Sequence, residues 1–360
     1  MIITEFEMTQ SVMPKEDKTW KFALAATSEI EGLVLRIGTR DGFTGYGYAS
    51  ATPHMGATMG TLAAELSFFR DHVVGKDAWN IEALLQGLDR ALRGASQAKA
   101  AIDCALFDLQ AQALGVPLNR LFGGVVRTQV PILRILAIKT PDEMAVQAKK
   151  LFDKGTRYFK IKVHGDVAED VARVKAIRKM LGDEAHLTID ANQAYTVKDA
   201  VTAISAMAEF GLDLAEQPVH VEDIEGLALV TKMVPVTVEA DEAAGSLRQV
   251  YDLVSRRVVD AVSLKIPKLG GLRNTVAAAR ICEAGGVKYR FGAAVGSRLL
   301  SAQAMHLACA LPGVDYACEL GEFDRLLDDP FGGIEIENGV LNLPAGNGSG
   351  VTPVKARVAA

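Results

Sequence analysis

The sequence predicts an α/β fold in which a (β/α)7β barrel follows a smaller α+β domain. Two observations carry this prediction. Between residues 130 and 320, eight short β-rich runs alternate with amphipathic stretches of helix length, whereas the first third of the chain lacks that alternation. Strands that alternate with helices indicate parallel βαβ units. A doubly wound sheet would usually have fewer units and a glycine-rich phosphate turn after its first strand, and no such turn occurs here.

The N-terminal domain is expected over residues 1–125. Residues 2–10 and 32–37 alternate between apolar and polar side chains, and the Asp41-Gly42 turn follows, which is typical of an antiparallel ribbon. Three helical patterns come next, around 56–74, 78–92 and 96–114. Gly115 and Pro117 then form an ordinary helix stop.

The barrel is expected over residues 126–325. Its predicted strands are 130–138, 157–163, 186–190, 212–216, 234–241, 259–266, 287–293 and 314–320. The remaining segment, 326–360, has to return to one of the two domains, and we expect it to complete the N-terminal one.

Composition excludes several classes of protein. Of 360 residues 49% are hydrophobic and 23% charged, which is ordinary for a globular chain, and the net charge is −5. Because nucleic-acid and membrane surfaces depend on clustered positive charge, neither is an expected partner. The four cysteines share no CxxC spacing, so a disulfide framework and a zinc site are also not expected. The first residues lack the pattern of a signal peptide, and we expect a cytoplasmic protein.

Charged residues recur at the ends of the predicted strands. They are Lys160 and Lys162, then Asp190, Glu216, Asp241, Lys265 and Glu319. From Lys162 onward the spacings are 28, 26, 25, 24 and 54 residues, the last being two units of 27. Any one of them alone would more often be a helix cap or a salt-bridge partner. Their joint register with the βα units indicates a shared site at the carboxyl ends of the strands, where barrel enzymes place their catalytic groups.

The residue types indicate metal-assisted acid–base chemistry. Asp190, Glu216 and Asp241 form an all-oxygen donor set that suits Mg²⁺, or Mn²⁺ as the alternative. Lys160 and Lys162 point to the same face of their strand, and a neighbouring ammonium favours the neutral form of Lys162, which then serves as a base. Lys265, on the far side, is expected to be a second acid/base or an electrostatic clamp. This set suits removal of a proton α to a carboxylate.

Five motifs in order resemble the enolase superfamily, specifically the muconate-lactonizing subgroup of the mandelate racemase/muconate lactonizing enzyme family. They are KIK at 160–162, DAN at 190–192, EQP at 216–218, ADE at 240–242 and KIPKLGG at 265–271; residues 98–124 also look like the end of the family's capping domain. The resemblance implies a TIM-like barrel closed by an N-terminal capping domain that the C-terminal tail completes. A symmetric homo-oligomer is also expected for a barrel of this type.

The resemblance also implies residue roles. Lys162 and Lys265 would be the acid/base pair, and Asp190, Glu216 and Asp241 the Mg²⁺ ligands. Lys160 would bind the substrate carboxylate and lower the pKa of Lys162. Three further motif positions would hold these catalytic and metal-binding side chains in place: Asn192, Glu242 and Lys268.

In this family the substrate is selected by capping-domain loops and by the ends of strands seven and eight. Four residues at such positions are substrate-binding candidates: Trp20, His54, Arg298 and Glu319. Arg298 would bind a second substrate anion from its place at a helix start. Strand seven contains no histidine, which disfavours the mandelate-racemase and sugar-acid dehydratase branches.

Strand eight is followed by ELGEFDRLLDD at 319–329. This segment resembles those of muconate cycloisomerases and N-acylamino-acid racemases more than the DxD motif of dipeptide epimerases. Val295 stands where the cycloisomerases carry Glu, which speaks against a muconate substrate.

The function expected from the sequence is a racemase or epimerase that acts on an N-substituted amino acid or a similar small-molecule carboxylate. Two alternatives use the same lysine pair: a muconate-type cycloisomerase and a dehydratase like o-succinylbenzoate synthase. Outside the family, a Schiff-base aldolase would also use a barrel lysine.

Overall fold

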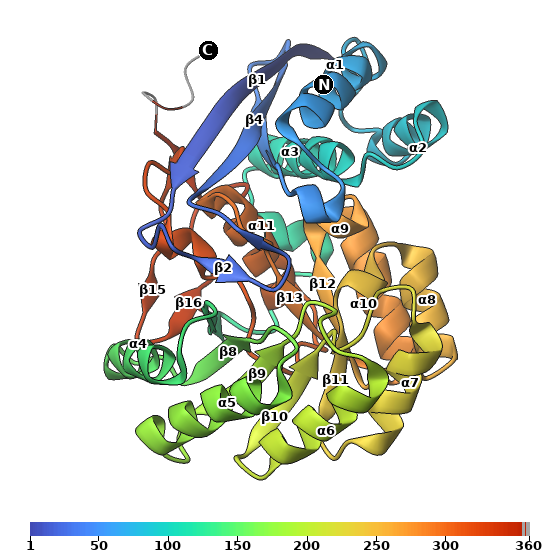
Figure 1. The fold of residues 1–360 in the computed structure, drawn as a ribbon. Helices are drawn as coiled ribbons and strands as arrows, with labels where there is room; N and C mark the ends of the chain where they lie inside the picture. Colours follow the sequence, from blue (N-terminus) through green and yellow to red (C-terminus); the bar gives the residue numbers. More distant parts are fainter. Residues whose placement is uncertain (355–356, 358–360) are drawn as a thin grey trace.

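The protein is described by a computed structural model that covers residues 1–354 and residue 357. The predicted α/β class is confirmed: a parallel barrel sheet lies below a smaller antiparallel domain, as Figure 1 shows. Residues 355, 356 and 358–360 of the predicted tail lie outside the described residues. Among the described residues, no helix combines the length and apolar character that crossing a membrane requires.

The N-terminal domain packs three helices on a three-stranded antiparallel sheet of order β1-β4-β5. Its strands and helices are β1 (Ile3–Pro14), β2 (Lys21–Phe22), β3 (Ala25–Ala26), β4 (Glu29–Thr39), β5 (Thr44–Ser50), η1 (Pro53–Met55), α1 (Met59–Val73), α2 (Ile81–Ala91), α3 (Ser96–Leu114) and η2 (Leu118–Phe122). Gly45 and Gly47 let β5 approach α3 closely, because a side chain at either position would collide with the α3 backbone. Helices α1, α2 and α3 confirm the three helices predicted from the sequence.

The barrel sheet has seven parallel strands in the order β7 to β13. They are β7 (Leu133–Leu136), β8 (Tyr158–Lys162), β9 (His186–Asp190), β10 (Leu212–Glu216), β11 (Thr237–Ala240), β12 (Ala261–Lys265) and β13 (Lys288–Gly292). The helices between and after them are α4 (Pro141–Asp153), α5 (Val167–Leu181), α6 (Val197–Ala208), α7 (Ile224–Met233), α8 (Leu247–Ser255), α10 (Leu272–Gly285) and α11 (Arg298–Ala310). Short turns add η3 (Glu242–Ala244), α9 (Ile266–Leu269) and η4 (Glu322–Arg325).

Most barrel helices begin at a side chain that caps the first turn. The capping residues of α4 to α8 and α11 are Thr140, Asp166, Thr196, Asp223, Ser246 and Ser297. Such caps accept a hydrogen bond from a free N–H of the first turn. Helix α10 differs, because the Asp103 Oδ1 of α3 accepts from Leu272 N at 2.6 Å. The N-terminal domain thus caps a barrel helix, and this contact links the two domains.

The run over 314–320, expected as an eighth strand, forms only single bridges. Cys318 N donates to Pro131 O on the β7 side at 2.9 Å, and Glu319 N donates to Phe291 O of β13, also at 2.9 Å. The segment forms too few backbone hydrogen bonds with either neighbouring strand to make a β-ladder. It nevertheless connects the first and the last strand of the barrel sheet. It therefore closes the barrel without being a regular strand.

The predicted first strand is divided in two. Its first residues form β6 (Gln129–Pro131), which pairs with the tail strand β16 (Val340–Asn342) rather than with β8. The other tail strands are β14 (Phe331–Gly332), β15 (Ile336–Glu337) and β17 (Thr352–Pro353).

The tail also contacts the N-terminal domain. Ser349 N donates to the Asp108 Oδ1 of α3 at 2.6 Å, and Leu327 N donates to Pro14 O at 2.8 Å. The tail therefore pairs with the barrel start and contacts the N-terminal domain. The domain boundaries at 125 and 325 stay predictions.

Candidate active site

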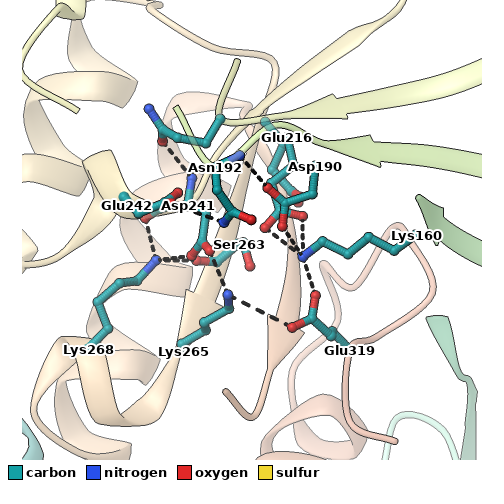
Figure 2. A network of polar contacts seen from close by, with 12 residues as sticks. Lys160, Asp190, Asn192, Glu216, Asp241, Glu242, Ser263, Lys265, Lys268 and Glu319 are labelled. Atoms are coloured by element: carbon teal, nitrogen blue, oxygen red, sulfur yellow. Dashed lines mark hydrogen bonds and ion pairs between the residues drawn. The ribbon is translucent and has the colours of Figure 1, made fainter. Parts of the chain in front are cut away.

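A cavity of about 630 Å³ lies between the barrel mouth and the N-terminal domain. Nine of the thirteen predicted site residues line it: Trp20, His54, Lys162, Asn192, Asp241, Glu242, Lys265, Lys268 and Glu319. Three more, Lys160, Asp190 and Glu216, are completely buried. Lys160 contacts Glu319 and Glu216 (Figure 2), and Asp190 contacts Lys162. The strand ends therefore meet at one mouth, as the spacing predicts.

Lys162 belongs to the β8 side of the mouth. Its Nζ lies 2.5 Å from Asp190 Oδ2 and 2.8 Å from Asn192 Oδ1. Asn192 in turn donates from Nδ2 to Glu242 Oε1 at 3.1 Å. Asn192 and Glu242 thus fix the direction in which Lys162 is held.

Lys265 belongs to the β12 side. Its Nζ lies 2.6 Å from Asp241 Oδ2, and Lys268 Nζ contacts Oδ1 of the same carboxylate at 2.7 Å. Burial lowers the pKa of Lys265, but the carboxylates of Asp241 and Glu319 outweigh it and hold that pKa above its ordinary value. In this arrangement the Lys265 ammonium is therefore protonated.

Strand order places these two lysines opposite each other. Strands β8 and β12 are separated by three strands on one side, and by β13, the closing segment and β7 on the other. In a closed ring of eight positions they are diametrically opposed. A molecule between them would be reached by one lysine from each face.

Lys160 holds three carboxylates together beneath the cavity. Its Nζ lies 3.0 Å from Asp190 Oδ2 and 2.8 Å from Glu216 Oε1, and it also contacts Glu319 Oε2. Burial raises the pKa of Glu319, but the nearby lysines Lys160, Lys265 and Lys162 outweigh it and lower that pKa to about 2. Glu319 is thus an ionised group at the end of the closing segment.

A buried ion pair that the sequence motifs do not predict lies next to Glu216. Arg290 of β13 contacts Glu216 Oε2 at 2.6 Å and Glu239 Oε2 of β11 at 2.5 Å. Both new residues are almost completely buried. The signal in the sequence was a charge inside an otherwise apolar strand run, which costs free energy unless it is paired.

The turns after β9 and β10 are strained. Asn192, Gln193 and Gln217 have φ values of 40°, 73° and 37°, a region that non-glycine residues seldom adopt and that clusters at functional sites. Gln217 Oε1 accepts hydrogen bonds from the N–H groups of Asp241 and Ala243, at 3.0 and 3.1 Å. These bonds hold the β10 and β11 ends in register despite the strain.

The carboxylates suit a hard cation by donor type. Asp190 and Glu216 pair in register on adjacent strands, Asp241 comes directly after the next strand, β11, and oxygen is their only donor atom. Among the described residues, no three His, Cys, Asp or Glu side chains are arranged to hold a metal ion, since lysine ammoniums lie between these carboxylates. Lys160 Nζ already marks a cation position shared by Asp190 and Glu216.

Side chains of the N-terminal domain form the roof of the cavity. Trp20 and Phe22 lie with their ring centroids 5.5 Å apart, and the His54 ring meets Phe22 edge-on at 5.1 Å. Lys162 Nζ lies 5.4 Å from the Phe22 centroid. Burial, Lys265 and Lys162 lower the pKa of His54, so its ring is neutral at neutral pH.

Arg298 does not join the group. It begins α11, and its guanidinium lies 3.4 Å from Asp329 Oδ2 and 5.0 Å from the Phe323 ring centroid. The tail residue Asp329 thus engages the side chain that was expected to bind a substrate anion, and Arg298 does not line the cavity.

Two family models match this chain. Residues 7–123 match the N-terminal domain of the mandelate racemase / muconate lactonizing enzyme family, and residues 143–357 match the enolase C-terminal domain-like model.

Known proteins resemble the chain over nearly its full length. A hydrophobic dipeptide epimerase of Enterococcus faecalis is 34% identical, over 94% of this chain and 96% of its own. A chloromuconate cycloisomerase of Cupriavidus necator is 34% identical, over 87% and 86%. The crystal structure of the dipeptide epimerase from Enterococcus faecalis, complexed with Mg and the dipeptide L-Leu-L-Tyr, is 33% identical, with a TM-score of 0.94 over 98% of this chain and 100% of that one.

Proposed function

Because the chain belongs to the mandelate racemase / muconate lactonizing enzyme family of the enolase superfamily, we propose that it removes and returns a proton α to a substrate carboxylate. Its relatives are epimerases, racemases and cycloisomerases, and the chain is an isomerase of this superfamily. This membership excludes the alternative function expected from the sequence, a Schiff-base aldolase. The specific reaction proposed is racemisation or epimerisation of an N-substituted amino acid.

The opposition of Lys162 and Lys265 across one cavity carries this proposal. Inversion at a carbon needs one group to take the proton from one face and another to return a proton to the opposite face. Lys162 and Lys265 lie on opposite sides of the space in which that carbon would sit. While its contact with Asp241 is in place, Lys265 would be the proton donor; for the other enantiomer it would act as the base only when that contact is released.

Three carboxylates would hold the metal ion, Mg²⁺ or Mn²⁺: Asp190, Glu216 and Asp241. The bound ion would supply charge stabilisation for the substrate carboxylate and would compete with the lysines for these oxygens. Lys160 balances the buried carboxylates and would help to bind the substrate carboxylate. Lys268 orients Asp241 through a contact of 2.7 Å, and Asn192 orients Lys162 through one of 2.8 Å.

The roof and wall of the cavity would select the rest of the substrate. Trp20 and Phe22 offer an apolar surface beside Lys162, and the neutral His54 ring offers one donor and one acceptor. Glu319 offers an ionised acceptor for an N–H group. An acylated amino group beside an apolar side chain matches this lining, and the C-terminal residue of a dipeptide is itself an N-acylated amino acid.

A cycloisomerase is the second candidate, because the chloromuconate cycloisomerase is as similar in identity as the dipeptide epimerase. Dehydration would also use the same lysines. Chiral chromatography after incubation of the enzyme and Mg²⁺ with L- and D-N-acyl amino acids, dipeptides, muconates and succinylbenzoate precursors separates these reactions. Inversion without a change of mass supports the proposal, whereas lactone or dehydrated product would support an alternative. The homo-oligomeric state stays a prediction.

A further inference from the structure

A second cavity of about 280 Å³ adjoins the candidate active site. It lies between the end of β1, helix α4 and the segment after Gly321, and it shares three wall residues with the first cavity: Lys15, Trp20 and Val295. The two cavities therefore meet at these three side chains.

Lys15 is a buried cation at the junction of the two cavities. Lys15 is only 5% exposed, and its Nζ lies 3.7 Å from the centroid of the Trp20 ring. The ammonium also donates a hydrogen bond to Thr27 Oγ1. Among the described residues, no carboxylate oxygen lies within 4 Å of it, whereas the other buried lysines of the site all have such a partner.

The other charged wall residues that are buried or half-buried have ion-pair partners. Arg134 contacts Asp324 at 3.0 Å, and Arg325 lies 3.9 Å from Glu322. Asp17 contacts Lys139 at 3.0 Å. The three remaining charged wall residues are exposed, namely Glu16, Lys150 and Lys154. Lys15 is thus the buried charge of this wall that lacks an ion-pair partner.

A buried ammonium without an anion is costly, because burial removes its hydration without a compensating charge. Burial lowers the pKa of Lys15 to about 8, against the weaker opposing effects of Glu322 and Asp17. The stacked Trp20 face and the Thr27 hydroxyl compensate for part of this cost. An anion placed in either cavity would complete the site.

We propose that Lys15 binds a second anionic group of the substrate, of carboxylate type, at the junction of the two cavities. This inference rests on the proposed function and narrows its substrate class to carboxylates that bear a second anion at the end of the N-substituent. Arg298, the residue expected from the sequence to bind such an anion, is engaged by Asp329. Lys15 takes over that role from the opposite, N-terminal domain.

The kinetic test uses two substrates that differ only in the distal charge, N-acetyl-leucine and N-succinyl-leucine. Lys15→Met keeps the length and the contact with Trp20 but removes the charge. The ratio of kcat/KM for the succinyl over the acetyl compound is expected to fall about tenfold or more, which corresponds to one lost charge-assisted hydrogen bond. Lys18→Met, an exposed lysine of the same loop, is the control and should leave the ratio unchanged.

A binding test does not depend on turnover. Trp20 and Trp79 are the two tryptophans, and Trp79 is 43% exposed outside both cavity walls. In a Trp79→Phe background, N-succinyl-leucine should change the Trp20 fluorescence saturably, at about a tenth of the N-acetyl-leucine concentration. Lys15→Met, with folding checked by circular dichroism, should abolish this difference.

The outcomes separate the two proposals. Tight, Lys15-dependent binding without any proton exchange would overturn the proposed function but support the anion site. Succinate that binds as tightly as N-succinyl-leucine would show that the site serves a free anion, and would overturn the substrate assignment. Equal affinities for the charged and uncharged compounds, unaffected by Lys15→Met, would overturn the anion site itself.

Discussion

Lys162 and Lys265 face one cavity from opposite sides of the barrel, and each is held by a different carboxylate. Lys162 Nζ lies 2.5 Å from Asp190 Oδ2, and Lys265 Nζ lies 2.6 Å from Asp241 Oδ2. The two ammoniums are thus oriented by separate predicted metal ligands on strands that are not neighbours. The proposed acid–base pair is therefore in direct contact with the proposed metal ligands.

Replacing either lysine should leave the enzyme able to exchange the α-proton of only one enantiomer. In Lys162→Gln and Lys265→Gln, racemisation should fall about 10³-fold, since a positioned acid–base group contributes roughly 10²–10⁴ in rate. Each variant should still exchange the α-proton of one enantiomer, and the two variants should favour opposite enantiomers. NMR of separate L and D substrates in D₂O measures this. Equal loss for both enantiomers in both variants would refute the two-face arrangement, and the exposed Lys198→Gln is the control.

Asp241→Asn should weaken the binding of Mg²⁺ and abolish Mg²⁺-dependent turnover. The substitution removes one of three carboxylates and leaves Lys265 and Lys268, which contact its oxygens at 2.6 and 2.7 Å, without their partner. Isothermal titration with MgCl₂ should show a loss of affinity of about 100-fold or more, since replacing a residue that only orients a ligand already costs roughly 10–100-fold. EDTA should inactivate the unmodified enzyme. The exposed Asp183→Asn serves as the comparison. Full activity in Asp241→Asn would show that the metal ligands are misassigned.

Replacing Arg290 should lower the free energy of unfolding strongly, because two buried carboxylates would lose their cation. Arg290→Met leaves the buried carboxylates of Glu216 and Glu239 without the guanidinium that contacts both. Removing one partner of a buried ion pair costs about 3–5 kcal/mol. Adding Glu239→Gln should restore part of that loss, because one unpaired charge disappears. Urea unfolding of the four proteins in this cycle measures the coupling, and strictly additive losses would mean that the pair is not coupled.

Stability should fall as the pH rises toward about 7, because of Asp103. Burial raises the pKa of this carboxyl to about 7, although hydrogen bonds from Leu272 N and the charge of Arg273 oppose it. Between the unfolded pKa near 4 and about 7 the folded state binds the extra proton, so the free energy of unfolding decreases with pH by up to about 1.4 kcal/mol per unit. Above about 7 the loss is complete.

Asp103→Asn isolates this effect, because the amide stays neutral at every pH. Asp108 contributes in the same direction only up to its own pKa of about 6, and it is present in both proteins. Urea unfolding at pH 6, 7 and 8 should therefore give a smaller pH slope for Asp103→Asn between pH 6 and 7. Identical slopes for the two proteins would show that Asp103 is ionised throughout.

The sequence predicts the strand ends well and their surroundings less well. Lys162, Asp190, Glu216, Asp241 and Lys265 could be placed because one residue per βα unit fixes both the strand and the end at which it lies. Parallel strands then bring these ends together without further information.

Features that depend on the distant tail could not be foreseen. Arg298 begins a helix near the barrel mouth, but Asp329, thirty-one residues later, engages it. No local pattern links these two positions. The Arg290–Glu239 pair escaped for a related reason: a charge within an apolar run shows that a partner exists but does not identify it.

The first predicted strand divides into β6 and β7 because two different parts of the chain pair with it. Pro131 has no N–H to donate, and its carbonyl accepts from Cys318 N, so the run divides between the tail sheet and the barrel. The Lys15 cavity likewise needs β1, α4 and the segment after Gly321 together. Such junctions form only in the complete fold.

The most direct test of the central claim is proton NMR in D₂O with Mg²⁺, following loss of the α-proton signal of N-acyl amino acids, dipeptides and other carboxylates. We expect exchange of the α-proton with inversion for at least one N-acylated amino acid, and no exchange in the Lys162→Gln/Lys265→Gln double variant. Exchange that persists in that double variant, or inversion without uptake of deuterium, would show that Lys162 and Lys265 are not the groups that move the α-proton.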